Sequence, residues 1–308
     1  MFAGVLLFTA TLAPAVEPPN PPIVWLHYDY MIKDGPNGHS HEPDPASIQL
    51  VVEAFRAHGI TLHIDPQHTA IPETDVLVFS PGFDPSQCGY FSQPSFSYFP
   101  DLKARYFHPQ GSRAWHYAIF GHYGESGMAP YCTSPEGQAD VGGYDFMVTQ
   151  GWIQETLPSI WTTDRPFMEG GVFMHELGHN LGLLHGGNEE LDLKPNYFSV
   201  MNNDNRWGIL VGAAPGSTQP ISRRLDYSDR ALPTVYEGHL NDTAGLSGPS
   251  DSADIARVLL CPFPSGHLAR CRELRATLRA HPIHRERSFR SGDAYLWLLP
   301  SISPPSRS

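Results

Sequence analysis

The stretch HELGHNLGLLHGG, residues 175–187, decides how this sequence is interpreted. Three histidines, one glutamate and separated glycines interrupt a largely apolar run. Because residues four apart lie on one face of a helix, His175 and His179 can aim two imidazoles at one point. Glu176 projects beside them rather than at the same point. In this H-E-x-x-H pattern, two histidines hold zinc and the glutamate acts as a general base.

The third histidine needs a break in the helix. His185 follows His179 by six residues, and a straight helix would carry it away from the metal. We expect a sharp turn near Gly182, because glycine adopts positive φ without a steric penalty. His185 would then complete three protein ligands for Zn²⁺ and leave the fourth position open, as catalysis requires. The alternative is a buried helix whose histidines bond only to carbonyls, which the full spacing disfavours.

Residues 175–187 resemble the zinc signature of the metzincin clan of metallopeptidases. That clan also carries a methionine-containing turn beneath the metal. The segment YFSVMNN, residues 197–203, places Met201 sixteen residues after His185. A broader and less specific similarity, to poorly characterised secreted metzincin-like proteins, covers residues 23–246. The resemblance implies that Met201 shapes the floor of the site by packing.

Two positions depart from the better-known members of the clan. Astacin-like and serralysin-like proteins carry a tyrosine two residues after the methionine, where this chain has Asn203. The residue after the third histidine is Gly186, in place of the serine, aspartate, glutamate or proline of those families. The resemblance therefore implies the clan and leaves the family within it unassigned.

The pattern along the chain predicts an α+β fold, because strands mix with a few long helices. Helical spacing of apolar residues begins after Asp44, the expected N-cap, and ends at Gly59. A short helix is expected over 152–161, and the motif helix is expected to begin near residues 169–171. Strands are predicted over 23–30, 60–65, 74–80, 113–121 and 144–151.

The resemblance implies a division into two subdomains around a zinc cleft. An upper catalytic subdomain, residues 23–185, would hold a mixed, mostly parallel sheet with backing helices. A lower, irregular subdomain, residues 186–298, would end in a C-terminal helix, for which the leucine spacing within residues 261–281 is suitable. The tail 299–308 is expected to be disordered.

Composition narrows the class of protein. The chain has 308 residues, of which 41% are hydrophobic, so a sizeable core is expected. Its formal charge of −12 argues against nucleic acid as a partner. No segment has the roughly 18 consecutive apolar residues of a membrane span. Residues 1–15 form an apolar run ending in small residues, which predicts a signal peptide and secretion, followed by a proline-rich leader over 16–22. The alternatives for residues 1–15 are an N-terminal tail or a truncated choice of start codon.

The four cysteines suit an oxidising compartment and form no C-x-x-C pair. They allow three pairings, of which we favour the local one, Cys88–Cys132 with Cys261–Cys271. Free buried thiols are the alternative.

Two weaker features remain. A second metal site could form from His108, His116 and His122, or around His39 and His41, although scattered histidines are more often surface residues. The segment GESGMAP, residues 124–130, lies where clan members have the edge strand at the rim of the cleft. There it could pair with an extended peptide, or it is an ordinary loop.

Together these features predict a secreted zinc metalloendopeptidase that hydrolyses protein or peptide substrates through a zinc-held water. His175, His179 and His185 would hold the metal and Glu176 would transfer the proton. One alternative is a zinc hydrolase of other amides or of terminal residues. The other is a binding protein in which zinc only joins two lobes, which Glu176 argues against, since a structural site has no use for it.

Overall fold

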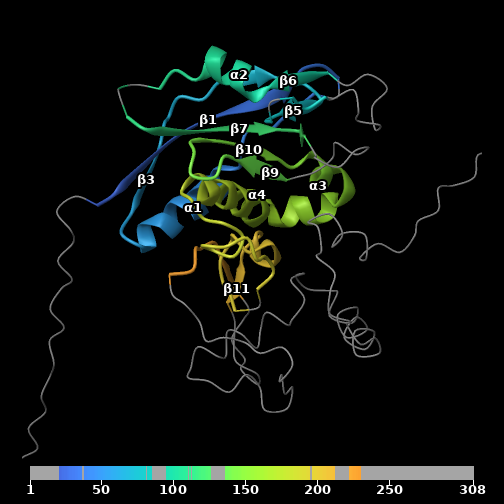
Figure 1. Ribbon diagram of the computed structural model, residues 1–308. Coiled ribbons are helices and arrows are strands. Elements are labelled where there is room, and N and C mark those ends of the chain that lie inside the picture. Colours follow the sequence, from blue (N-terminus) through green and yellow to red (C-terminus); the bar gives the residue numbers. More distant parts are fainter. Residues whose placement is uncertain are drawn as a thin grey trace, which may run out of the picture.

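The computed structural model describes residues 21–229, except 37, 81, 85–94, 110, 112, 126–135, 195 and 212–221. Within this part of the chain, a mixed sheet lies between helices on its two sides (Figure 1). The predicted α+β class and the mostly parallel sheet are confirmed. In the described residues, no helix has the length and apolar character needed to cross a membrane.

The main sheet is built around β1 (Ile23–Lys33), which pairs in parallel with β7 (Trp115–Gly121). On the far side of β7 follow β10 (Asp145–Thr149), parallel, and β9 (Gly137–Ala139), antiparallel, at the edge. The remaining partners of β1 are β2 (His39–Ser40), β3 (Thr61–Ile64) and β4 (Ala70–Pro72), of which only β2 is antiparallel. A smaller parallel sheet joins β5 (Val76–Val78), β6 (Phe96–Tyr98) and β8 (Tyr123–Gly124).

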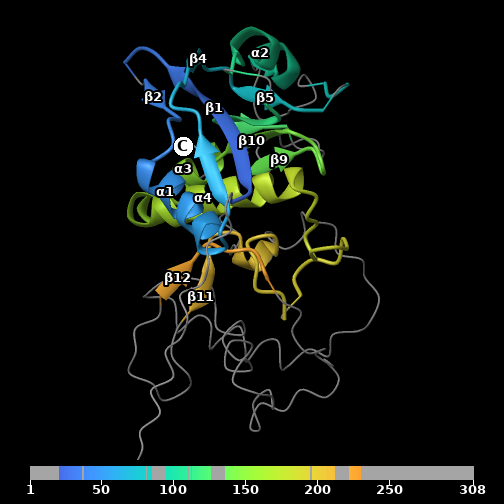
Figure 2. The same ribbon diagram turned by 90° about the vertical axis from the view of Figure 1, so that its left-hand side faces the viewer.

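Alternating residues of β7 supply two separate cores, as the two-residue period of a strand requires. Ala118 and Phe120 face a core shared with α1 (Pro45–Ala57) and α4 (Pro158–Asn180). Tyr117 and Ile119 face the opposite side, where α2 (Phe99–Tyr106) packs. The result is a layered arrangement with α2 on one face of the sheet and α1 and α4 on the other (Figures 1 and 2). The helix that carries the motif is therefore held directly against the sheet.

The local signals around α1 are confirmed. The side chain of Asp44 accepts a hydrogen bond from the Ala46 amide at 2.8 Å, as expected of an N-cap. Gly59 follows the helix with φ of +70°, a conformation that glycine adopts at helix ends at little cost.

The predicted start of the motif helix was wrong. The sequence suggested a start near residues 169–171, but α4 begins at Pro158, and the predicted short helix is reduced to α3 (Gly151–Thr156). Proline is favoured at the first helical positions. The glycines that suggested a start permit close packing instead. A Cβ on Gly170 would lie 2.8 Å from the Ser47 carbonyl oxygen of α1, and one on Gly171 would overlap the backbone of Arg206.

Beyond α4 the chain is irregular as far as a 3-10 turn, η2 (Asn203–Asn205), and a hairpin of β11 (Ile209–Val211) and β12 (Ser222–Arg224). This hairpin lies on the side of α4 away from the sheet (Figure 2). The division at residue 186 remains a prediction. Residues 1–15, the four cysteines, the C-terminal helix and the tail 299–308 lie outside the described residues.

Candidate active site

The three motif histidines converge. His175 and His179 come from the last two turns of α4, and His185 from the segment that follows it. The ring centroids lie 4.8 Å apart for His175 and His179, 5.2 Å for His175 and His185, and 4.9 Å for His179 and His185. One nitrogen from each ring lies within 4.8 Å of the others. The local sequence therefore brings together all three predicted ligands.

The end of α4 explains how His185 returns. Gly182 has φ of +89°, the left-handed conformation that the spacing predicts. The Gly182 amide donates to the His179 carbonyl and the Leu183 amide to the Gly178 carbonyl, both at 2.9 Å. These are the two hydrogen bonds of a Schellman motif, which ends a helix and reverses the chain.

A second tight turn presents His185. Leu184 and Gly187 exchange both backbone hydrogen bonds, at 2.7 and 2.8 Å, so His185 and Gly186 occupy the tip of the turn. The Lys194 ammonium donates to the Gly186 carbonyl at 2.6 Å and fixes the turn from outside. The third imidazole is thus positioned by backbone geometry.

Hydrogen bonds orient the other two rings. Nδ1 of His175 lies 2.7 Å from the Val200 carbonyl oxygen, and Nδ1 of His179 lies 2.8 Å from the Leu183 carbonyl oxygen. A carbonyl only accepts, so each Nδ1 carries the proton and each Nε2 presents a lone pair. The two Nε2 atoms face one another at 3.1 Å. Two lone pairs at that distance repel, and a cation between them would bind both.

The electrostatic environment keeps these imidazoles neutral. Burial, followed by the neighbouring His179, lowers the pKa of His175 well below its usual value. Burial and His185 likewise lower the pKa of His179. Neutral imidazole is the form that binds metals. With His185, the two rings supply three imidazole nitrogens within 4.8 Å of one another, a donor set that fits Zn²⁺ with one position left over.

Glu176 directly follows His175 on α4 and is almost completely buried. Burial, followed by the negative charge of Glu136, raises the pKa of the Glu176 carboxyl well above its usual value. The edge strand β9 approaches this side chain closely. A Cβ on Gly137 would lie 2.6 Å from both Cγ and Oε1 of Glu176. Only glycine at position 137 leaves room for Glu176 in its present place.

A carboxylate and a guanidinium support this edge of the site. Glu136, next to Gly137, accepts hydrogen bonds from Arg206 Nε at 2.9 Å and from Trp207 Nε1 at 2.8 Å. Its second oxygen lies 3.0 Å from another guanidinium nitrogen of Arg206. This bidentate pair ties β9 to the segment before β11. No motif in the sequence marks Gly137, Glu136 or Arg206, because the contact depends on how β9 pairs with β10.

Met201 lies beneath the motif helix and is fully buried. A Cβ on Gly178 would overlap its sulfur and would lie 2.9 Å from Cε1 of Tyr227. The hydroxyl of Tyr227 donates to the Met174 carbonyl at 2.6 Å. The side-chain amide of Asn203 donates to the Asp192 carboxylate. The side chain at position 203 is therefore engaged by a carboxylate of the segment that follows the motif.

The structure does not bring together His108, His116 and His122, which the sequence analysis grouped as one possible metal site. His116 is bonded to the Asn180 amide oxygen at 3.1 Å and belongs to the buried packing of α4 on the sheet. His108 lies 3.0 Å from the Arg105 carbonyl at the end of α2. His122 instead lies with His39 and His41 in a second cluster. In the predicted edge segment 124–130, Gly124 belongs to β8 and residues 126–130 lie outside the described residues.

Three solved structures resemble this fold. Archaemetzincin from Methanopyrus kandleri is 14% identical, with 62% of this chain and 84% of that chain covered and a TM-score of 0.33. A zinc-dependent peptidase from Methanocorpusculum labreanum strain Z is 14% identical, with 57% of this chain and 87% of that chain covered and a TM-score of 0.36. Archaemetzincin from Archaeoglobus fulgidus, complexed with malonate, is 15% identical, with 57% of this chain and 85% of that chain covered and a TM-score of 0.29. No protein-family model and no curated protein matches the chain.

Proposed function

We propose that this chain is a zinc-dependent peptidase, and specifically a secreted endopeptidase. His175, His179 and His185 are the proposed zinc ligands, and Glu176 is the proposed general base. One observation carries the proposal. Two Nε2 lone pairs face each other at 3.1 Å within a triad of imidazoles, and a buried carboxylate, Glu176, directly follows the first of them on α4.

The proton chemistry falls to Glu176. Bound zinc would polarise a substrate carbonyl and lower the pKa of a water molecule. The carboxylate of Glu176 would accept a proton from that water and pass it to the leaving amine. Such transfer contributes typically about 10²–10⁴-fold to the rate.

The residues around the triad would hold this geometry. The Val200 and Leu183 carbonyls fix the two helical imidazoles, as partners of metal ligands usually do. Met201 fills the space below the helix, and Gly137 leaves space for the Glu176 side chain. The site would therefore be arranged before substrate arrives.

The edge of the sheet suggests where a peptide would lie. β9 is the last strand of the main sheet in the described residues, and a Cβ on its Gly137 would lie 2.6 Å from the Glu176 carboxylate. An extended peptide added to β9 would run beside the carboxylate. This placement favours cleavage within a chain, and hence an endopeptidase.

The decisive experiment measures cleavage and metal content together. Zinc-loaded protein would be incubated with a peptide library, and the cleavage sites would be read by mass spectrometry. Glu176→Gln should lower the rate by at least about 10²-fold and keep its zinc, whereas His179→Ala should lose one zinc equivalent. Glu53→Gln, an exposed substitution on α1, is the matched control. Wild-type protein without cleavage, or a Glu176→Gln protein with unchanged rate, would contradict the proposal.

Secretion rests on the apolar run of residues 1–15. We expect the exported protein to begin after Ala15. Sequencing the amino terminus of secreted material tests this, and a secreted chain that still starts at Met1 would count against a cleaved signal peptide.

A further inference from the structure

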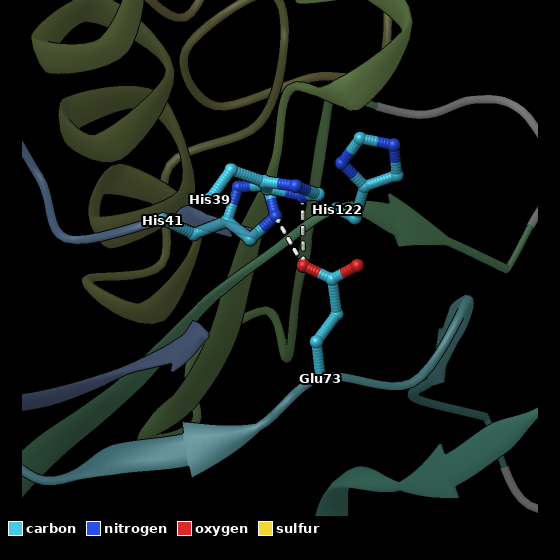
Figure 3. A group of neighbouring side chains, drawn as sticks. All are labelled: His39, His41, Glu73 and His122. Carbon is cyan, nitrogen blue, oxygen red and sulfur yellow. Dashed lines mark hydrogen bonds and ion pairs between the residues drawn. The ribbon is translucent and has the colours of Figure 1, made fainter. Parts of the chain in front are cut away.

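A second group of metal-ligating side chains lies outside the proposed active site. His39, His41, Glu73 and His122 each place one ligand atom within 4.8 Å of the others (Figure 3). None of them belongs to α4 or to the segment that follows it. We propose that these four residues form a second, structural site for a divalent transition metal, with zinc as the best fit.

The sheet topology brings these residues together. Glu73 directly follows β4, and His122 directly follows β7. Both strands run parallel to β1, so their carboxyl ends meet at the same edge of the sheet. His39 and His41 reach this edge through β2, which folds back antiparallel on the end of β1.

The backbone around the cluster is well anchored. The His41 amide donates to the Met31 carbonyl and the Glu73 amide donates to the Ile32 carbonyl, both at 2.9 Å. The His122 carbonyl accepts from the Gly151 amide at 2.8 Å. The ligand positions are thus fixed by strand β1 and by the start of α3.

The geometry matches that of the proposed catalytic triad. Ring centroids in the second cluster lie 4.9 Å apart for His39 and His41, and 5.1 Å for each of them and His122. Nε2 of His39 and of His41 lie 2.9 and 2.8 Å from Oε2 of Glu73. With zinc–ligand bonds of about 2.0–2.2 Å, the corners of a tetrahedral site are roughly 3.4 Å apart. Small movements of side chains would admit the ion.

His122 provides an independent indication of a metal. Its Nε2 lies 3.2 Å from Oε1 of Glu155, whereas its Nδ1 is buried with no hydrogen-bond partner in the described part of the chain. Figure 3 shows one ring nitrogen of His122 facing the imidazoles of His39 and His41. Because Nε2 is the nitrogen at Glu155, the facing atom is Nδ1. A carboxylate behind a histidine whose other nitrogen faces the metal is a common arrangement in zinc proteins.

The number of ligands assigns a structural role. Three imidazoles and one carboxylate complete a tetrahedral shell, so no position remains for a water or a substrate. The Lys33 ammonium lies 3.8 Å from the other oxygen, Oε1, of Glu73, which leaves Oε2 to the histidines. A bound ion would join the carboxyl ends of β4 and β7 to β2 and the residue that directly follows it.

The test measures zinc binding in the full chain after chelator treatment, by calorimetric titration and elemental analysis. Wild-type protein should bind two equivalents, and His179→Ala should bind one. In the His179→Ala background, His122→Asn should weaken the remaining site at least about 100-fold, and Glu155→Gln, which keeps all four ligands, about 10–100-fold. His58→Asn, a substitution of a histidine paired with Asp226, should change nothing.

Separate controls distinguish loss of zinc at the second cluster from loss of the fold and from loss of zinc at the His175 triad. Circular dichroism identifies a variant that has lost its fold, and Glu155→Gln then still tests the site. If His179→Ala binds no zinc, or if neither His122→Asn nor Glu155→Gln weakens binding, the cluster is only an ion-paired group and the proposal fails. If instead the His175 triad binds no metal, wild type and His179→Ala would both bind one equivalent, which is lost in His122→Asn.

Discussion

Gly137 offers the sharpest test of how β9 shapes the site. An alanine Cβ would lie 2.6 Å from Cγ and Oε1 of Glu176 and 2.8 Å from its Cδ. Ordinary contact between such atoms requires roughly 3.5–4.0 Å, so the carboxylate would have to move by about 1 Å. Misplacing a catalytic group by about that distance can cost about 10²-fold in rate. We therefore expect Gly137→Ala to lower kcat by about 10²-fold while zinc content stays unchanged, because no proposed ligand is touched.

A double-mutant cycle separates this effect from general damage to β9. If Gly137→Ala acts through the carboxylate, it should cost little in a Glu176→Gln background, where the base is already gone. Steady-state kinetics on one cleaved peptide would provide kcat and KM for all four proteins. A wild-type kcat in Gly137→Ala, or the same loss in both backgrounds, would refute the reasoning.

Three further predictions concern stability. Gly182→Val should lower the free energy of unfolding by about 1–3 kcal/mol because the position has φ of +89°, and it should weaken zinc binding through His185. Asparagine tolerates this backbone conformation, so Gly182→Asn should lower the free energy of unfolding less. Equal melting temperatures for the two variants would contradict the argument. Gly178→Ala should destabilise by about 1–3 kcal/mol because its Cβ overlaps the sulfur of Met201, and Met201→Ala should relieve part of that loss in the double variant. Burial lowers the pKa of His27, but its hydrogen bonds to Asp29 and Asp65 raise this pKa overall above 6.5. The stabilisation of the fold by the protonated His27 imidazole is therefore fully present below pH 6.5 and is lost as the pH rises through the folded-state pKa. The melting temperature of His27→Gln should therefore fall further below wild type near pH 5.5 than near pH 8.5, and an equal gap would show that the imidazole does not titrate in this way.

The parts of the site that local geometry determines could be predicted from the sequence. Helical spacing places His175 and His179 together, and the positive φ of Gly182 follows from the need to return His185. These relations involve only about a dozen consecutive residues. They do not depend on the order of strands in the sheet.

Contacts between distant segments could not be predicted in this way. Gly137 and Glu136 reach Glu176 only because β9 pairs antiparallel with β10. The start of the motif helix was predicted wrongly for the same reason. Gly170 and Gly171 leave room for the close approach of α1 and of Arg206, and they do not mark a helix end. The helix α2 was missed because only Phe99 and Leu102 of its eight residues are buried, which leaves little apolar period to detect.

The second cluster also depends on contacts between distant segments, and the sequence alone did not predict all of its members. Nearness in sequence grouped His122 with His108 and His116, but His116 lies within β7 and contacts α4, whereas His122 lies beyond the end of that strand. Its partner Glu73 is distant in sequence and has no motif. The cluster becomes visible only once β4 and β7 are known to run parallel to β1.

The two clusters share a trio of imidazoles at nearly equal spacing, and a single carboxylate distinguishes them. Glu73 occupies the ligand sphere, with Oε2 at 2.8–2.9 Å from two imidazoles, and so it closes the second site. Glu176 is offset by one helical position from the proposed ligand His175, so it lies beside the first site and leaves it open. Removing Glu73 would open a coordination position in the second cluster without supplying a base beside it. We therefore expect Glu73→Ala in a Glu176→Gln background to gain no peptidase activity, even where the second site retains metal.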